Sequence, residues 1–193
     1  YQKSCEEMAE ILGPNSVDVI ITDPPYPYEF IDTFSELSKT ASVVLKEGGS
    51  CLVMSGQTHL PEVMKRLAEN LTYHWCCSYL TTGGHTNIHQ RNVSAGWKPV
   101  LWYQKGKYDG NYIGFDSFRS NGNDKNHHFW GQNVYGFDQI VKAFTKPKNI
   151  ILDPFVGGGT TGIAALENNC FFIGSDIDSD SIKKTLHRLQ GDH

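Results

Sequence analysis

Short β-branched runs alternate with helix-like segments along most of the chain. The last third shows this most clearly, with predicted elements at 136–144 (helix), 150–152 (strand), 160–168 (helix), 171–175 (strand) and 178–189 (helix). Consecutive strands that are joined through helices run parallel and are covered by those helices on both faces. The sequence therefore predicts an α/β fold with a mostly parallel sheet and helices on both faces.

The first part of the chain continues this alternation. Strands are predicted at 17–22, 50–54, 73–80 and 99–104, and helices at 30–45 and 60–71. The polar, glycine-rich stretches 81–97 and 105–128 are predicted to be loops that face a substrate. No repeat, low-complexity tract or linker interrupts the pattern, so residues 1–193 are expected to form one domain.

Composition bounds the class of protein. No apolar run approaches the roughly 20 residues that span a bilayer, and no basic-then-apolar signal pattern opens the chain. The five cysteines, Cys5, Cys51, Cys76, Cys77 and Cys170, form no C-x-x-C pair or zinc-finger spacing. We therefore expect a soluble, cytoplasmic protein with reduced thiols, no metal site and no membrane association. Because the first residue is Tyr1, we also expect the chain to be a piece of a longer protein.

The net charge limits how the chain could bind nucleic acid. A formal charge of -4 argues against binding by bulk electrostatics, because phosphate neutralisation normally shows as an excess of Lys and Arg. A local basic face or a partner would have to supply the attraction. The candidates for such a face are Lys98, Lys105, Lys107, Arg119 and Lys125, which could equally be ordinary surface residues.

A glycine-rich loop directly follows the strand at 150–152 and precedes a helix. It reads Asp153-Pro154-Phe155-Val156-Gly157-Gly158-Gly159-Thr160-Thr161. Glycines let the backbone approach a ligand and aim helix N–H groups at it, and Asp176 at the next strand end could bind a ribose diol. No Lys-Thr or Lys-Ser follows, so a nucleoside without a bound phosphate suits the loop better than a nucleotide. A tight turn, with Asp176 capping its own helix, is the alternative.

A second constellation, Asp23-Pro24-Pro25-Tyr26, directly follows the strand at 17–22. The amino group of adenine or cytosine is a poor nucleophile because its lone pair is delocalised, so a catalyst must accept its hydrogens. The Asp23 carboxylate and the Pro24 carbonyl can be those acceptors. Tyr26 offers a flat face on which a base flipped out of its helix can stack. Alone, such a string is often a surface turn, but a strand end in an α/β sheet is where ligands bind.

The two constellations together resemble the permuted class of DNA amino-methyltransferases, in which the catalytic half precedes the cofactor half. The resemblance also covers the run Ser16–Thr22, the run Lys98–Gly106 and the run Gly174–Asp178, and so spans nearly the whole chain. It implies a Rossmann-like methyltransferase fold, S-adenosylmethionine as cofactor, and DNA as the partner that supplies the flipped base. A homodimer or a specificity partner would also be consistent with it, as would a bacterial or phage-encoded source.

The resemblance assigns roles to individual residues. The catalytic residues would be Asp23, Pro24, Pro25 and Tyr26. The cofactor site would be formed by Asp153, Pro154, Phe155, Gly157, Gly159 and Thr160, with Asp176 on the ribose, Ile177 against the adenine and Gln132 at the methionine end. Residues 105–128 would form a short recognition insertion within a single catalytic domain.

The chain departs from the family pattern at two places. The stretch Phe129–Gly136 stands where the family has His-Pro-Thr-Gln-Lys-Pro, and only Gln132 is carried over. Lys3-Ser4 stands where the family has Gly-Asp, so we expect the strand that contacts the cofactor adenine to lie before Tyr1.

The identity of the methylated group is left open by these motifs. Asp at the start of the catalytic tetrapeptide favours the N6 amino group of adenine, and N4 of cytosine is the alternative. Related tetrapeptides also serve RNA and protein glutamine, although the permuted motif order speaks against both. An inactive subunit that binds DNA or cofactor without turnover is the non-enzymatic alternative.

Overall fold

The computed structural model describes residues 1–82, 85–108, 110, 114–121 and 134–191. The helices are α1 (Cys5–Leu12), α2 (Thr33–Val44), α3 (Leu60–Leu67), α4 (Val134–Phe144), α5 (Thr160–Glu167) and α6 (Ser179–Leu189), with short 3-10 turns η1 (Tyr28–Phe30) and η2 (His89–Arg91). The strands are β1 (Val17–Thr22), β2 (Leu45–Met54), β3 (Thr72–Leu80), β4 (Thr86–Ile88), β5 (Val93–Ala95), β6 (Trp97–Gln104), β7 (Ser117–Arg119), β8 (Ile150–Asp153) and β9 (Phe171–Gly174).

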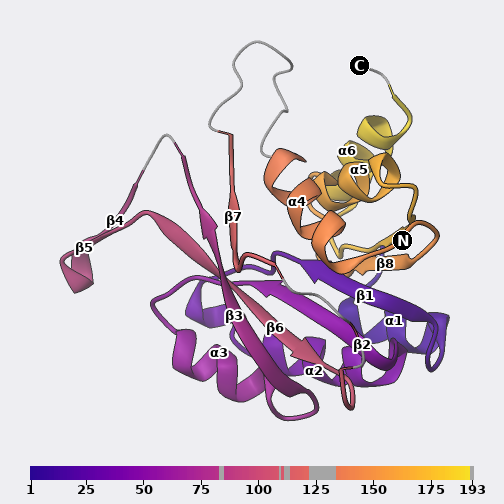
Figure 1. The fold of residues 1–193 in the computed structure, drawn as a ribbon, viewed down its shortest axis with the longest axis horizontal. Helices are drawn as coiled ribbons and strands as arrows, with labels where there is room; N and C mark the ends of the chain where they lie inside the picture. Colours follow the sequence, from indigo (N-terminus) through magenta and orange to yellow (C-terminus); the bar gives the residue numbers. More distant parts are fainter. Residues whose placement is uncertain (83–84, 109, 111–113, 122–133, 192–193) are drawn as a thin grey trace.

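A seven-stranded sheet organises the described residues (Figure 1). Its strand order is β7-β3-β6-β2-β1-β8-β9. The pairs β1–β2, β1–β8, β8–β9 and β3–β7 are parallel, whereas β6 is antiparallel to both of its neighbours. The predicted mostly parallel sheet is therefore confirmed.

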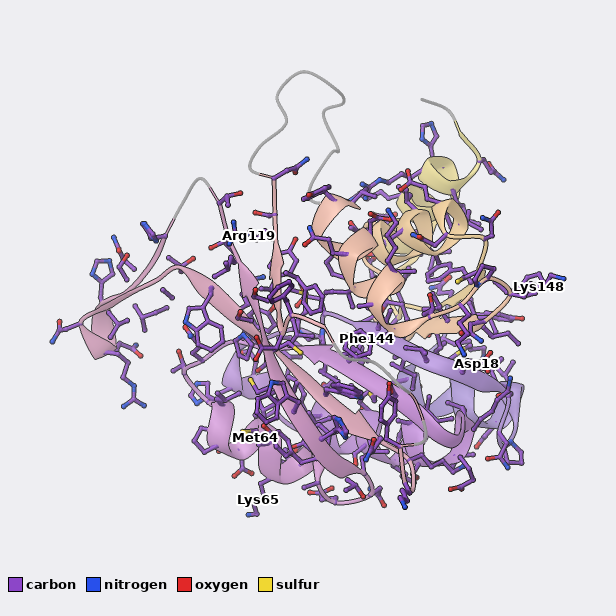
Figure 2. All side chains as sticks on the ribbon, viewed as in Figure 1. Asp18, Met64, Lys65, Arg119, Phe144 and Lys148 are labelled. Carbon is purple, nitrogen blue, oxygen red and sulfur yellow. The ribbon has the colours of Figure 1, made fainter. Side chains whose placement is uncertain are left out.

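Helices cover the two faces of this sheet. One core cluster joins α1, α2 and α3 to the first face, with Met8, Phe34 and Leu67 fully buried. The other cluster joins α4 and α5 to the second face, where Ile140 and Ala164 are buried. Figure 2 shows Phe144 of α4 over the middle of the sheet, where its ring lies 4.7 Å from that of Trp102. The predicted helix layers are thus present on both faces.

Several local predictions need correction. Helix α1 was not predicted, although the capping box between Ser4 and Glu7 and the buried Cys5 and Met8 are local signals of a short helix. Strand β2 starts at Leu45 instead of Ser50, with an irregularity that lets it pass through Gly48 and Gly49. The helix predicted for 60–71 ends at Leu67.

The stretch 81–97 was predicted to be a loop, but it contains a β-hairpin. Strands β4 and β5 pair antiparallel in a small sheet of their own, with Asn92 in a left-handed conformation after η2. Figure 1 shows this hairpin projecting from the sheet. Polar side chains on both strands conceal a hairpin from a pattern search, because no apolar alternation marks it. The hairpin therefore projects beside the carboxyl end of β3.

The cysteine prediction holds. All five thiols are free, and Cys5, Cys51, Cys77 and Cys170 are buried while Cys76 is partly buried. Burial raises the pKa of Cys5 to about 12, which keeps this thiol protonated and unreactive. None of the helices in the described ranges has the length and apolar character needed to cross a membrane.

Candidate active site

The carboxyl ends of β1, β8 and β9 lie side by side at one edge of the sheet. The chain passes from β1 to β2 on one side, whereas β8 leads to β9 on the other side. Such a reversal opens a crevice above the strand ends, which is where α/β proteins bind ligands. An aspartate stands at each of these strand ends: Asp23 follows β1, Asp153 ends β8, and Asp176 follows β9.

Asp153 ties two of these strand ends together. Its side chain is 3% exposed, and its Oδ1 accepts hydrogen bonds from the Thr22 hydroxyl at 2.6 Å and from the Phe155 N–H at 3.1 Å. Burial raises the pKa of Asp153 to about 6, although these bonds and one from Thr161 act in the opposite direction. Asp153 therefore links the ends of β1 and β8 beneath the crevice. Pro154, beside it, is also buried.

The glycine loop adopts a conformation that favours glycine at two positions. Gly157 has φ +47° and Gly159 has φ +76°. A Cβ on Gly157 would point into open space, with its nearest atom 3.9 Å away, whereas a Cβ on Gly159 would lie 3.0 Å from Thr185. Gly157 thus leaves room for a ligand, and Gly159 allows α6 to approach the loop.

Asp176 is positioned by the backbone that surrounds it. Its Oδ2 accepts from Gly157 N–H and its Oδ1 accepts from Asp178 N–H, each at 3.0 Å. A carboxylate oxygen has two lone pairs, so both oxygens keep an acceptor site for a diol. Ile177 beside it is 75% exposed and offers an apolar contact. These features suit a nucleoside that lies across the ends of β8 and β9.

The N-terminal residues complete this end of the crevice. Gln2 forms a parallel bridge with Asp176, and Lys3 N–H donates to the Asp176 carbonyl at 3.1 Å. Residues 1–3 thus lie alongside the chain that follows β9, next to Asp176. Ser4 at the expected acidic position caps α1 instead of carrying a charge.

Asp23 lies at the end of β1 with two partners. The Tyr26 hydroxyl donates to its Oδ1, and the Lys98 ammonium lies 3.9 Å from its Oδ2. The same ammonium lies over the Tyr26 ring, 4.9 Å from the ring centroid. Desolvation raises the pKa of Asp23, and the charge of Lys98 and the bond from Tyr26 oppose this shift. Although 38% of the side chain is exposed, the protein around it still removes enough water to disfavour its charge.

Tyr79 joins this group from the cross-strand position opposite Lys98. Burial and the negative charge of Asp23 raise its pKa to about 12, so its hydroxyl stays protonated. Its ring packs on the backbone of Gly136, where a Cβ would overlap the hydroxyl oxygen. Gly136 is therefore the residue that lets α4 approach the site.

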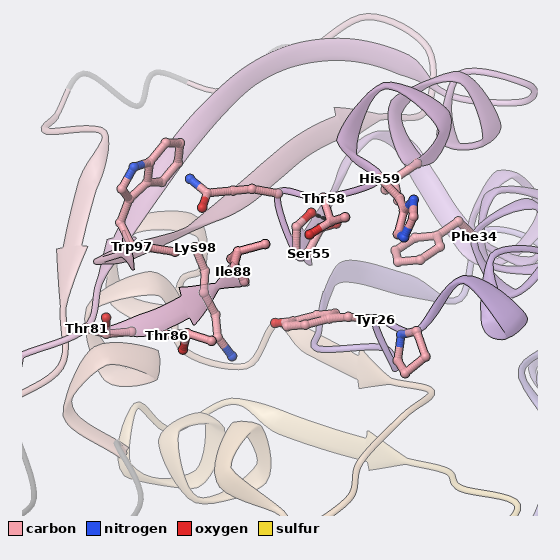
Figure 3. Close-up of a pocket in the computed structure, with 15 residues that line it drawn as sticks. Tyr26, Phe34, Ser55, Thr58, His59, Thr81, Thr86, Ile88, Trp97 and Lys98 are labelled. Atoms are coloured by element: carbon pink, nitrogen blue, oxygen red, sulfur yellow. Dashed lines mark hydrogen bonds between the residues drawn. The ribbon is translucent and has the colours of Figure 1, made fainter. Parts of the chain in front are cut away.

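A cavity of about 350 Å³ opens beside Tyr26 (Figure 3). Its walls come from the loops after β1 and β2, the start of β6 and the β4–β5 hairpin. The residues that line it include Tyr26, Phe34, Ser55, Gln57, Thr58, His59, Ile88, Trp97 and Lys98. Figure 3 shows His59 and Phe34 at one end, Trp97 and Lys98 at the other, and the Tyr26 ring along one wall. The cavity combines aromatic walls with a few polar groups, as sites for planar ligands do.

The structure brings together most, but not all, of the residues expected from the sequence. Pro24 is buried and Pro25 is exposed beside Asp23, while Phe155 and Thr160 are partly buried at the glycine loop. Gln132 lies outside the described residues. Sequence reasoning missed Gln57, Thr58 and His59, because an isolated polar tripeptide after a strand carries no motif. It also missed Thr185 and Arg188 of α6, which contact the glycine loop.

The expected basic face is only partly assembled. Lys98 is at the site, but Lys105 lies at the opposite end of β6, where its ammonium donates to the carbonyls of Val43 and Leu45 at 3.2 and 2.8 Å. Arg119 is the last residue of β7, which runs parallel to β3. Figure 2 shows Arg119 far from Asp18, which lies near the amino end of β1. Lys125 lies outside the described residues. Within the described part of the chain, no His, Cys, Asp and Glu side chains group in a way that could hold a metal ion.

Solved structures of methyltransferases share this architecture. The PvuII DNA methyltransferase (cytosine-N4-specific) superposes with a TM-score of 0.84 at 15% identity, over 100% of this chain and 86% of that one. The M1.HpyAVI complex with S-adenosylmethionine superposes with a TM-score of 0.74 at 20% identity, over 98% and 97% of the two chains. The fold is the Rossmann-like fold of S-adenosylmethionine-dependent methyltransferases.

Sequence comparisons narrow the class. A family described as DNA methylase matches residues 116–186. The Type II methyltransferase M2.DpnII of Streptococcus pneumoniae is 24% identical over 94% of this chain and 85% of its own length. The DNA adenine methyltransferase YhdJ of Escherichia coli (strain K12) is 25% identical over 90% and 76%. Over most of its length, this chain is therefore similar to DNA methyltransferases.

Proposed function

We propose that this protein is a DNA methyltransferase that transfers a methyl group from S-adenosylmethionine to the exocyclic N6 amino group of adenine in DNA. The observation that carries the proposal is the position of Asp23. Its carboxylate lies between the crevice above β8 and β9 and the cavity that opens at Tyr26. A cofactor on one side and a base on the other would meet at this carboxylate.

The residues around the glycine loop suit the cofactor. Asp176 has acceptor sites left for the ribose hydroxyls, Ile177 is exposed for contact with the adenine ring, and Gly157 leaves the space that a side chain would fill. Because Asp176 follows β9 and Asp23 follows β1, the methionine end would lie over β8, between them. The bound cofactor supplies an electrophilic methyl carbon on a sulfonium sulfur.

The cavity beside Tyr26 suits the flipped base. A base stacked on the Tyr26 ring would gain about 1–3 kcal/mol from stacking and would face the polar groups of Gln57 and Thr58. The amino group would then donate to the Asp23 carboxylate and to the Pro24 carbonyl. These acceptors draw the nitrogen toward tetrahedral geometry and align its lone pair with the methyl carbon.

Methyl transfer to the amino nitrogen needs no strong base. The amino nitrogen forms a bond to the methyl carbon as the carbon–sulfur bond breaks, and the sulfur takes the electron pair. The nitrogen then carries a positive charge and one proton too many. The Asp23 carboxylate accepts that proton and passes it to solvent. Lys98 favours the ionised form of Asp23 at the start of this sequence.

Adenine is proposed because Asp opens the tetrapeptide and because the relative YhdJ is described as a DNA adenine methyltransferase. N4 of cytosine is the second candidate, since the PvuII enzyme with the same fold is cytosine-N4-specific. Residues 105–128 are proposed to contribute to sequence recognition, although Lys105 itself is directed away from the site.

The test is incubation with labelled S-adenosylmethionine and mixed-sequence double-stranded DNA, followed by nucleoside analysis. Asp23→Ala is run beside the unaltered chain, with Asp32→Ala as a matched surface control outside the site. We expect N6-methyladenine that disappears in Asp23→Ala and persists in Asp32→Ala. N4-methylcytosine would assign the second candidate, and cofactor binding without any methylated base would indicate an inactive subunit.

A further inference from the structure

Helix α6 contacts the glycine loop through two side chains one turn apart. The Thr185 hydroxyl donates to the Gly157 carbonyl at 2.9 Å, and the Arg188 guanidinium donates to the Gly158 carbonyl at 2.8 Å. The same Arg188 nitrogen donates to the Thr160 hydroxyl oxygen at 3.1 Å. Helix α6 therefore binds carbonyls of the loop, while the Gly157 N–H of the same loop donates to Asp176.

Within the described residues, no acidic side chain balances the charge of Arg188. Among the residues that the structure describes, no carboxylate lies within ion-pairing distance of this partly buried guanidinium. Burial lowers its pKa, which shows that the surroundings disfavour the cation. Arg188 also lies at the N-terminus of α5, where the helix dipole opposes a positive charge. An anion bound at this loop would relieve both costs.

The contact between Arg188 and Thr160 also orients a proton. A guanidinium can only donate, so the Thr160 oxygen must accept in this bond. The hydroxyl hydrogen of Thr160 is then free to point toward another acceptor. A carboxylate is an acceptor on both of its oxygens and carries the missing negative charge.

We propose that Arg188 is a positioning residue for the carboxylate at the methionine end of the cofactor. Arg188 orients the Thr160 hydroxyl so that this hydroxyl donates a hydrogen bond to the carboxylate. The guanidinium also supplies the compensating positive charge. The inference rests on the proposed placement of the cofactor over β8 and β9. It assigns specificity for the amino-acid end of the cofactor to α6, an element outside both sequence motifs.

A matched pair of ligands tests the assignment. S-adenosylhomocysteine and 5′-methylthioadenosine are both uncharged at sulfur, and the second lacks the amino-acid end. Their affinities are measured by isothermal titration calorimetry. Arg188→Met should weaken S-adenosylhomocysteine roughly tenfold to a hundredfold, because hydrogen bonds to charged groups are lost, and should leave 5′-methylthioadenosine nearly unchanged. Arg188→Lys should restore part of the lost affinity.

Two variants separate this role from loop packing. Thr160→Val removes the hydroxyl without altering Arg188 and should show the same selective loss, which keeps the test decisive if Arg188→Met does not fold. Thr185→Val loosens the loop at Gly157 and should weaken both ligands by the same factor. Equal losses for both ligands in Arg188→Met and Thr160→Val would overturn the inference. If the unaltered chain binds neither ligand, the proposed cofactor site itself is wrong.

Discussion

The buried carboxylate of Asp153 should make the stability of this protein depend on pH. Its folded pKa is about 6, whereas the unfolded value is 3.8. Since the folded value is the higher one, the folded chain binds more protons between these limits, and stability falls as pH rises. Each pKa unit corresponds to about 1.4 kcal/mol, so the shift of about two units lowers the free energy of unfolding by about 3 kcal/mol above pH 6.

Asp153→Asn should remove this dependence. The Asn oxygen can still accept from Thr22 and from the Phe155 N–H, while the amide nitrogen can donate to the Thr161 hydroxyl. The variant should therefore gain stability relative to the unaltered chain as pH rises from 4 to 8, by up to about 3 kcal/mol. Urea unfolding at several pH values, followed by circular dichroism, measures the difference between the two chains.

The control for this exchange is Thr22→Val. It removes the 2.6 Å bond to Asp153 but keeps the shape of the side chain, so it should raise the pKa of Asp153 and steepen the loss of stability with pH. Parallel pH profiles for the unaltered chain and Asp153→Asn would refute the reasoning. Asp153→Asn should bind S-adenosylhomocysteine about as well as the unaltered chain does, because Asp153 is 3% exposed. A large loss of affinity would instead mean that Asp153 contacts the cofactor.

Three exchanges test the proposed site directly. Tyr26→Ala should raise the KM for DNA roughly tenfold or more, because base stacking contributes about 1–3 kcal/mol, and an unchanged KM would count against stacking. Asp176→Ala should weaken S-adenosylhomocysteine about tenfold or more in calorimetry, whereas Asp178→Ala, which removes the N-cap of α6, should cost only about 1 kcal/mol of stability. Lys98→Met should raise the pKa of Asp23, so the acidic limb of the pH–rate profile should move to higher pH; a limb that stays in place would contradict the role of Lys98.

Local sequence signals predicted the elements that form the cofactor half of the fold. The strands β8 and β9, the loop between β8 and α5, and the helix α6 all lie within a residue or so of their predicted limits. These elements follow each other closely in the chain, and their apolar periodicity and glycines are local properties. The prediction was weaker in the β4–β5 hairpin, which carries too few apolar residues to mark a period. Helix α1 was missed although its capping box and its apolar residues are local signals.

The sequence by itself determined where the three aspartates stand, because each follows or ends a β-branched or apolar strand that can be recognised from its own residues. Only the tertiary structure decided what surrounds them. Lys98 meets Asp23 because β6 runs antiparallel to β2, which places the start of β6 at the same edge of the sheet as the end of β1. Arg188 meets the glycine loop because α6 packs against α5. Such contacts join residues that lie far apart in the chain, and strand order and helix packing, which no local pattern encodes, bring them together.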